Sequence, residues 1–218
     1  MSTDSEARQD SANHEDLGQQ LDKSKTAMIV VDMQNAFLSE EGSMTLGGMD
    51  ITDLKNTVVP VSCLVDTCHE AGVPVIFTRY VLRADYKDAG LRSERRAEFK
   101  RINSLVTGTW DAELDSRMDA QPGDFILDKT RYSSFYNTSL EVILRGLDVD
   151  TLIVCGVTTE ICVESTIRDA YFRDYKIFVP EDAVAAMDAE RHEGTLKTIR
   201  YDFGTVVSSA TIIKALEA

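Results

Sequence analysis

The chain has 218 residues, of which 43% are hydrophobic and 28% are charged, and its formal net charge at pH 7 is −14. This length suits one α/β domain with a full core, and the charge argues against a nucleic-acid partner because phosphates would be repelled. No apolar run approaches the roughly 20 residues of a membrane span, so we expect a cytoplasmic protein without a membrane partner.

Residues 1–22 are polar and charged and lack hydrophobic periodicity. Such a composition predicts a mobile or loosely attached N-terminal arm. His14 lies in this arm and is given no role. The remaining residues, 23–218, are expected to form a single domain.

Apolar runs and helical patterns alternate along residues 23–218. Short apolar runs predict strands at 26–32, 73–78, 125–127 continuing to 129, 152–155, 176–180 and 205–208. Helical spacing predicts helices at 53–71, 138–147 and 189–201, another after the turn at Gly156, and a short one from 210. Residues 81–119 follow no clear pattern, and we expect them to arch over the sheet edge. Strands that alternate with helices indicate a parallel sheet covered on both faces, which is an α/β fold.

Three residues with chemically useful side chains follow strands of this sheet. Asp32 ends the first strand, Lys129 ends the third, and Cys162 follows the fourth. Ligands of open parallel sheets bind at the carboxyl ends of the strands, so residues far apart in the sequence can meet there. Each residue alone has a simpler explanation, such as a solvated strand end or an ordinary buried cysteine. Their joint placement predicts one site.

Cys162 is expected in the first turn of a helix that Thr158 or Thr159 can cap. At that position the helix dipole and free backbone N–H groups favour the thiolate over the thiol. The other cysteines, at positions 63, 68 and 155, are expected to fill apolar space, without a disulfide framework.

A cysteine nucleophile needs a base or a cation to activate it. The histidines at positions 14, 69 and 192 are poorly placed, so Asp32 and Lys129 are the candidates. The lysine ammonium lowers the pKa of the thiol, and the carboxylate takes its proton and returns it to a leaving amine. Backbone N–H groups of Thr158 and Cys162 can face the oxyanion. This chemistry is acyl transfer at a carbonyl, with hydrolysis of a C–N bond as the expected case.

Three stretches carry a resemblance to a known family: VVDMQNAF around Asp32, LDKTRYSSFYNT around Lys129 and CGVTTEICVESTIRDAYFRDY around Cys162. In this order they resemble the isochorismatase-like cysteine hydrolases, from about residue 26 to the C-terminus. The resemblance implies a Rossmann-like three-layer α/β/α fold with a six-stranded parallel sheet and a catalytic triad of Asp32, Lys129 and Cys162. It also implies a cis peptide between Val157 and Thr158 that turns the Thr158 N–H into the oxyanion site, and a homo-oligomer, either a dimer or a tetramer.

Within that family the chain looks most like the ureidoacrylate amidohydrolases, through the run GTWDAELDSRMDAQPGDFILDKTRYSSFYNT followed by CVESTIRDAYF. Such enzymes cut an N-carbamoyl group to give ammonia and carbon dioxide through a carbamate. Relatives cleave biuret, N-carbamoylsarcosine or other small amides, and these substrates stay open as alternatives. Nicotinamidases of the family bind a metal through an Asp-x-His arrangement after the second strand. The corresponding TRYVLRADY lacks histidine, so we expect no metal or other cofactor.

Several further side chains are candidate substrate contacts. Arg79 can pair with a substrate carboxylate or with an acid such as Asp85. Trp110, the only tryptophan, can close the pocket or belong to the core. Four residues follow Lys129 closely enough to line the pocket: Tyr132, Phe135, Tyr136 and Asn137.

Two interpretations from other functional classes remain at this stage. One is a catalytically silent binding protein that keeps the fold. The other is a redox-responsive protein whose cysteine is oxidised rather than acylated.

Overall fold

The computed structural model describes residues 21–218. Of the predicted arm, residues 1–20 lie outside the described residues. Leu21 is buried in the core, and the Asp22 carboxylate accepts a hydrogen bond from the Ser24 N–H and so caps the short 3-10 helix η1 (Lys23–Lys25). Within the described part, no helix is both long and apolar enough to span a membrane.

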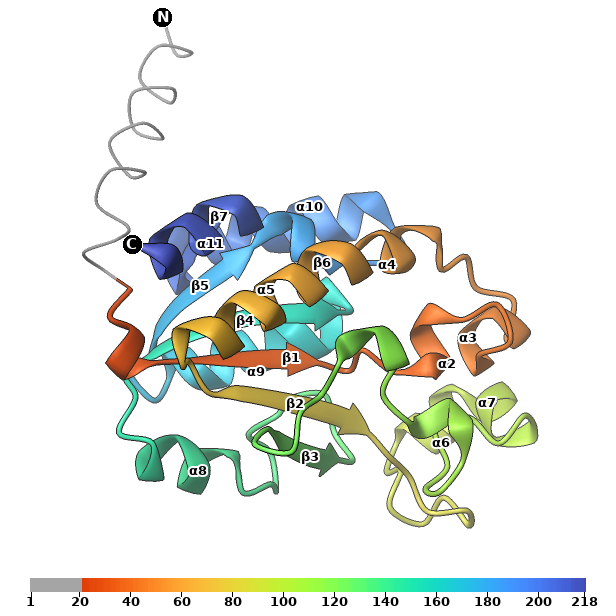
Figure 1. Ribbon diagram of the computed structural model, residues 1–218. Helices are drawn as coiled ribbons and strands as arrows, with labels where there is room; N and C mark the ends of the chain where they lie inside the picture. The colour runs from red at the N-terminus through yellow and green to blue at the C-terminus, as the bar shows by residue number, and fades with distance from the viewer. Residues whose placement is uncertain (1–20) are drawn as a thin grey trace, which may run out of the picture.

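Within residues 21–218, seven parallel strands form one central sheet (Figure 1). Six of them lie in the order β3-β2-β1-β4-β5-β7, and a two-residue strand, β6, pairs with the end of β4. The predicted six-stranded parallel sheet is therefore confirmed. A strand as short as β6 carries no sequence pattern and was not predicted. The strands are β1 (Thr26–Val31), β2 (Val75–Tyr80), β3 (Phe125–Lys129), β4 (Thr151–Val157), β5 (Lys176–Pro180), β6 (Val184–Ala185) and β7 (Thr205–Val207).

The two central strands are buried along their whole length. Every residue of β1 and of β4 is buried, as expected for apolar, β-branched runs that have helices on both faces. Ile29 of β1 pairs with Ile76 of β2 on one side and with Val154 of β4 on the other. The strand β2 continues two residues beyond the predicted end because Arg79 and Tyr80 pair with Asp128 and Lys129 of β3.

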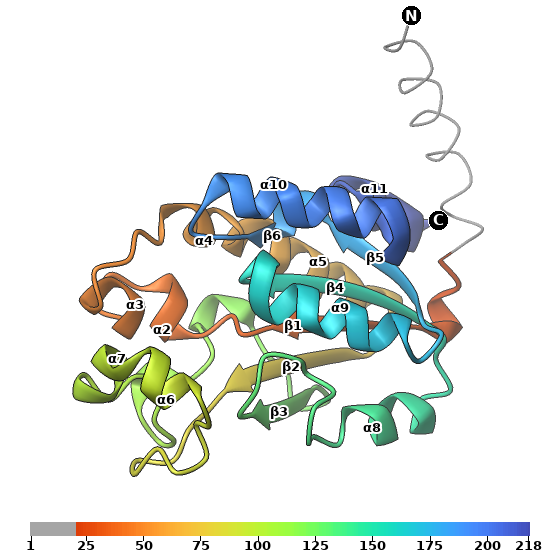
Figure 2. The ribbon, with the colours of Figure 1, turned by 180° about the vertical axis from the view of Figure 1, so that it is seen from behind.

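Helices cover both faces of the sheet (Figures 1 and 2). From β1 the chain crosses to β2 on one face, and from β4 it crosses to β5 on the other, so the direction of winding changes between β1 and β4. The helices α5 (Val58–Ala71) and α11 (Ser209–Glu217) pack together on one face. The opposite face is covered by α8 (Leu140–Gly146), α9 (Glu164–Tyr171) and α10 (Ala189–Thr198), the last of which continues into the π-helix η6 (Ile199–Phe203).

The predicted helix 53–71 is divided into α4 (Thr52–Asn56) and α5. Pro60 has no N–H to donate to the carbonyl of residue 56, so a continuous helix would lose a hydrogen bond there. The helix ends at Gly72 as predicted, in the left-handed conformation with φ of 72°. Cys68 is buried, but Cys63 is exposed on the same helix and does not fill apolar space as expected.

Short helices gather beyond the carboxyl ends of β1 and β2 (Figures 1 and 2). Residues 81–119 lie there rather than over the sheet edge as expected. The Gln34 side chain holds them in place, because its Nε2 donates to the carbonyls of Tyr80 (3.1 Å) and Ala112 (2.7 Å). These elements are α2 (Asn35–Leu38), α3 (Ser43–Leu46), α6 (Arg92–Arg95), α7 (Ala97–Arg101), η2 (Trp110–Ala112) and η3 (Ser116–Met118).

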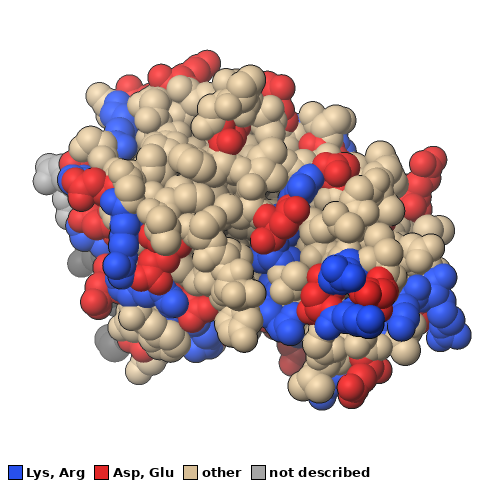
Figure 3. Space-filling model, turned by 90° about the horizontal axis from the view of Figure 1, so that it is seen from below, with Lys and Arg blue, Asp and Glu red and all other residues tan. Residues whose placement is uncertain are grey.

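Charged side chains of both signs are interspersed on the face shown in Figure 3, despite the acidic net charge. Many of them form ion pairs on the surface. On α9, Arg168 Nη2 lies 2.6 Å from Glu164 Oε1, one turn earlier in the helix. Exposed pairs of this kind contribute about 1 kcal/mol or less.

Gly156 is required where β4 passes β1. Its φ is +106°, and a Cβ atom there would lie 2.1 Å from the Val31 carbonyl oxygen. We expect Gly156→Ala to lower the free energy of unfolding by about 2–3 kcal/mol, since backbone strain and overlap both add to the cost. Urea denaturation measures this. The matched control is Gly194→Ala in α10, where no atom lies within 4 Å of the new Cβ and a small gain in stability is expected. Equal stability of the two variants would contradict the argument.

Candidate active site

A buried ion pair joins the carboxyl ends of β1 and β3. Lys129 Nζ donates to Asp32 Oδ2 at 2.7 Å, and both side chains are completely buried. Lys129 reaches Asp32 by crossing the ring of Tyr80 on the intervening strand β2, with Nζ 5.0 Å from the ring centroid. The other carboxylate oxygen, Asp32 Oδ1, accepts a hydrogen bond from Thr78 Oγ1 at 3.1 Å. The pair therefore connects three neighbouring strands.

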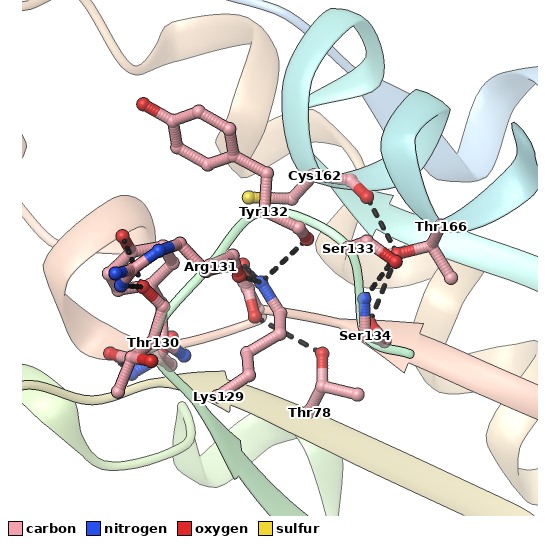
Figure 4. Close-up of polar contacts among 12 residues, drawn as sticks. Thr78, Lys129, Thr130, Arg131, Tyr132, Ser133, Ser134, Cys162 and Thr166 are labelled. Atoms are coloured by element: carbon pink, nitrogen blue, oxygen red, sulfur yellow. Dashed lines mark hydrogen bonds and ion pairs between the residues drawn. The ribbon is translucent and has the colours of Figure 1, made fainter. Parts of the chain in front are cut away.

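Lys129 is held as a fixed cation. Besides Asp32, its ammonium donates to the carbonyls of Arg131 (3.2 Å) and Tyr132 (3.0 Å), which belong to the loop after β3 (Figure 4). Full burial by itself lowers the pKa of this lysine, but the charge and hydrogen bond of Asp32, with a further contribution from Cys162, outweigh burial and raise the pKa above its ordinary value. Lys129 thus stays protonated at neutral pH.

The same loop also fixes the segment that carries Cys162. This buried cysteine lies in a five-residue π-helix, η4 (Thr159–Val163), which leads into α9. The Cys162 carbonyl accepts a hydrogen bond from Thr166 Oγ1 at 2.7 Å, and Thr166 Oγ1 accepts one from the Ser134 N–H at 3.0 Å (Figure 4). Lys129 and Cys162 are therefore positioned by one stretch of backbone.

The turn between β4 and η4 contains a cis peptide bond between Val157 and Thr158. Thr158 is the residue before the π-helix, but its side chain makes no capping hydrogen bond. Thr159 Oγ1 is instead 2.9 Å from His192 Nδ1. The predicted side-chain cap at Thr158 or Thr159 is thus replaced by a contact to α10.

Cys162 is a thiol at neutral pH, which corrects the expectation of a thiolate. Burial raises its pKa to about 12, the charge of Lys129 lowers it, and the charge of Asp32 raises it. Lys129 cannot offset the lost hydration because its charge is already paired with Asp32. The interaction of the thiol with the Asp32 carboxylate favours the protonated sulfur, so Asp32 is the group placed to take its proton.

A cavity of about 360 Å³ opens onto Cys162, a size that suits a small molecule. Phe37, Met44 and Phe99 contribute to its apolar wall, and Thr158 also lines it. Among residues 21–218, no group of three or more His, Cys, Asp or Glu side chains is placed to hold a metal.

The model of the isochorismatase domain matches residues 26–211. The chain belongs to the isochorismatase family. It is 34% identical to a ureidoacrylate amidohydrolase, RutB, of Agrobacterium fabrum over 213 residues, which cover 87% of this chain and 93% of the relative.

Solved structures of the isochorismatase family have the same fold. A cysteine hydrolase from Pseudomonas syringae pv. phaseolicola matches with a TM-score of 0.84 and 36% identity, over 90% of this chain and 94% of that one. An N-carbamoylsarcosine amidase from Thermoplasma acidophilum matches with a TM-score of 0.70 and 30% identity, over 85% and 96% of the two chains. These similarities place the chain near the amidohydrolase branch of the isochorismatase family.

Of the six candidate substrate contacts, all within the described residues, only Tyr132 lines the cavity. Phe135 packs against Tyr175 with ring centroids 6.1 Å apart, and Tyr136 and Asn137 are exposed. Trp110 lies neither in the core nor at the cavity, and its side chain is half exposed.

Arg79 lies outside the cavity because two acids hold it. Its Nε is 2.8 Å from Asp128 Oδ1 and its Nη1 is 2.5 Å from Glu113 Oε2, whereas Asp85 pairs with Arg83. The expected ion pair of Arg79 is therefore present, although its acids are Asp128 and Glu113 and not Asp85, the example given from the sequence.

The polar residues of the cavity wall that sequence reasoning missed include Arg92 and Glu160. Glu160 falls within the motif around Cys162, so its place in the sequence was a usable signal. Arg92 lies in the segment without periodicity, where nothing in the sequence indicates which side chains face the sheet.

We expect Arg79→Gln to change kcat/KM by less than about threefold, because the Arg79 guanidinium is paired with two surface acids and does not line the cavity. Steady-state kinetics on an amide that the protein is found to hydrolyse measures this. The comparison is Tyr132→Ala, which alters the cavity wall and is expected to raise KM. A larger effect from Arg79→Gln than from Tyr132→Ala would contradict the placement of Arg79.

Proposed function

We propose that this protein is a cysteine amidohydrolase that cleaves a C–N bond of a small ureido or amide substrate, with a ureidoacrylate-like N-carbamoyl acid as the best candidate. The observation that carries the proposal is the packing of Asp32, Lys129 and Cys162 at one end of a cavity of small-molecule size. The 34% identity to a ureidoacrylate amidohydrolase and the likeness to an N-carbamoylsarcosine amidase support the substrate class.

In the first half of the proposed reaction, the Cys162 sulfur attacks the carbamoyl carbon and its proton passes to Asp32. The new oxyanion faces the N–H groups of Thr158 and Cys162. When the C–N bond breaks, Asp32 returns the proton to the leaving nitrogen, and a thioester-type acyl-enzyme remains. Lys129 keeps its proton throughout and holds the Asp32 carboxylate in place.

In the second half, water attacks the acyl carbon and gives its proton to Asp32. The C–S bond then breaks and Cys162 is reprotonated. With an N-carbamoyl substrate the product is a carbamate, which decomposes to ammonia and carbon dioxide. A single carboxylate thus serves as base and acid in both halves, which requires that it stays fixed between the thiol and the lysine.

The test is an ammonia-release screen of the purified protein on ureidoacrylate, biuret, N-carbamoyl amino acids, nicotinamide and maleamate. We expect the highest kcat/KM for an N-carbamoyl acid, together with a covalent adduct on Cys162 seen by mass spectrometry after rapid quenching. Absence of turnover on all of these substrates would favour a catalytically silent protein.

A further inference from the structure

Arg92 is a cation of the cavity wall that has no acidic partner among residues 21–218. It lies on α6 and lines the same cavity as Cys162. Of the other two arginines that line the cavity, Arg96 forms an ion pair with Glu98, and Arg191 is exposed, whereas Arg92 is half-buried. Arg92 forms no ion pair with any residue of 21–218, although acids at positions 50, 160 and 188 also line the cavity. A half-buried cation without a counterion is unusual in a protein with a net charge of −14.

Two aromatic rings hold the Arg92 guanidinium in place. Its central carbon lies 4.8 Å from the ring centroid of Tyr80 and 5.5 Å from that of Phe99. Ring faces attract a cation and fix its position, but they leave the N–H donors in the guanidinium plane free. Lys129 Nζ also lies over the Tyr80 ring, so this one ring contacts both Arg92 and the lysine of the Asp32–Lys129 pair.

The Arg92 charge also reaches the reacting sulfur. It acts on Cys162 to lower the thiol pKa, against the larger effect of burial. An anion bound by Arg92 would therefore lie in the cavity beside Cys162. The planar fork of N–H donors matches the two oxygens of a carboxylate.

We propose that Arg92 binds the carboxylate of the substrate, so that the cavity selects ureido or amide acids over neutral amides. This inference rests on the proposed amidohydrolase function, and it gives to Arg92 the role that the sequence had suggested for Arg79. It also places biuret and nicotinamide, which carry no carboxylate, among the poor substrates.

The first test needs no knowledge of the substrate. Iodoacetate and iodoacetamide both alkylate Cys162 with loss of iodide, and they differ only in a carboxylate against a carboxamide. We expect Arg92→Gln to lower the ratio of the iodoacetate rate to the iodoacetamide rate about 10- to 100-fold. A change in the pKa of Cys162 affects both reagents equally and cancels in the ratio. Peptide mass spectrometry separates Cys162 from the exposed Cys63.

Two further variants keep this test decisive. Arg92→Lys retains the charge and is expected to retain part of the preference for iodoacetate. Arg95→Gln changes an exposed arginine of the same short helix that does not line the cavity, and its ratio should match that of the parent protein. An unchanged ratio in Arg92→Gln would overturn the inference, whether or not any amide is turned over.

The second test uses turnover. For an accepted N-carbamoyl acid and its neutral carboxamide analogue, Arg92→Gln should lower kcat/KM for the acid about 10- to 100-fold and change that for the neutral analogue little. The loss should appear mainly in KM. Equal losses on both compounds would refute a carboxylate contact while leaving the amidohydrolase function intact. Lack of any turnover in the parent protein would refute that function alone, because the alkylation ratio remains measurable.

Discussion

Replacing Cys162 by alanine is expected to lower amide turnover by at least about 10⁴-fold, because in the proposed reaction this residue supplies the atom that bonds to the substrate carbon. The fold should survive, since the change removes one sulfur from the edge of a cavity that is already open. Initial rates of ammonia release, with thermal unfolding as the check on folding, measure both effects.

The controls for Cys162→Ala separate nucleophilic catalysis from other roles of a thiol. Cys162→Ser keeps a hydroxyl nucleophile of similar size but is expected to be nearly as inactive, because the site is built to deprotonate a thiol. Cys63→Ala removes an exposed cysteine and should leave turnover unchanged. Turnover that persists in Cys162→Ala would exclude the proposed mechanism. A protein whose cysteine only senses oxidation would show no turnover in any form.

The sequence was sufficient to predict most of the sheet and the three residues at its carboxyl end. Fully buried parallel strands leave clear apolar runs, and Asp32, Lys129 and Cys162 each follow such a run. Their convergence depends only on strand direction and order, which the alternation of strands and helices already restricts.

The substrate side of the site could not be predicted in the same way. Residues 81–119 form short helices held by individual contacts, such as the Gln34 amide bonded to Ala112, and such contacts leave no periodicity. Arg79 and Arg92 are equivalent as residue types, and only the structure shows that one is paired with acids and the other is not.

The protonation state of Cys162 could not be predicted from the sequence for a different reason. Its position at the start of a helix suggested a thiolate, but the pKa depends on how much water remains near the sulfur and on whether the lysine charge is free. In the structure the sulfur is buried and Lys129 is bound to Asp32, so the thiol prevails. In the proposed reaction, proton transfer to Asp32 must then accompany attack on the substrate.

Replacing Lys129 by methionine is expected to lower the free energy of unfolding by about 3–5 kcal/mol, because it leaves the buried Asp32 carboxylate without its cation. Turnover should fall as well, since the base loses its fixed position. The matched control is Lys55→Met, which breaks the exposed pair with Glu40 and should cost about 1 kcal/mol or less. The double variant Asp32→Asn/Lys129→Met, which has no buried charge at this place, should recover part of the stability but not the activity.

The pKa of Lys129 sets the pH range in which its charge stabilises the fold. The pKa of Lys129 is raised in the folded protein, so the stability that it contributes is fully present below its unfolded value of about 10.5 and is lost only as the pH rises through the folded value. Below about pH 9 the titration of Lys129 itself therefore adds no pH dependence to the difference in stability between the parent protein and Lys129→Met. Lys129 also lowers the pKa of Cys162, so the alkylation profile of Cys162 should move to higher pH in Lys129→Met. An unchanged alkylation profile would mean that Lys129 acts on Asp32 alone. A loss of stability as small as that of Lys55→Met would mean that the Asp32–Lys129 pair does not hold the site together.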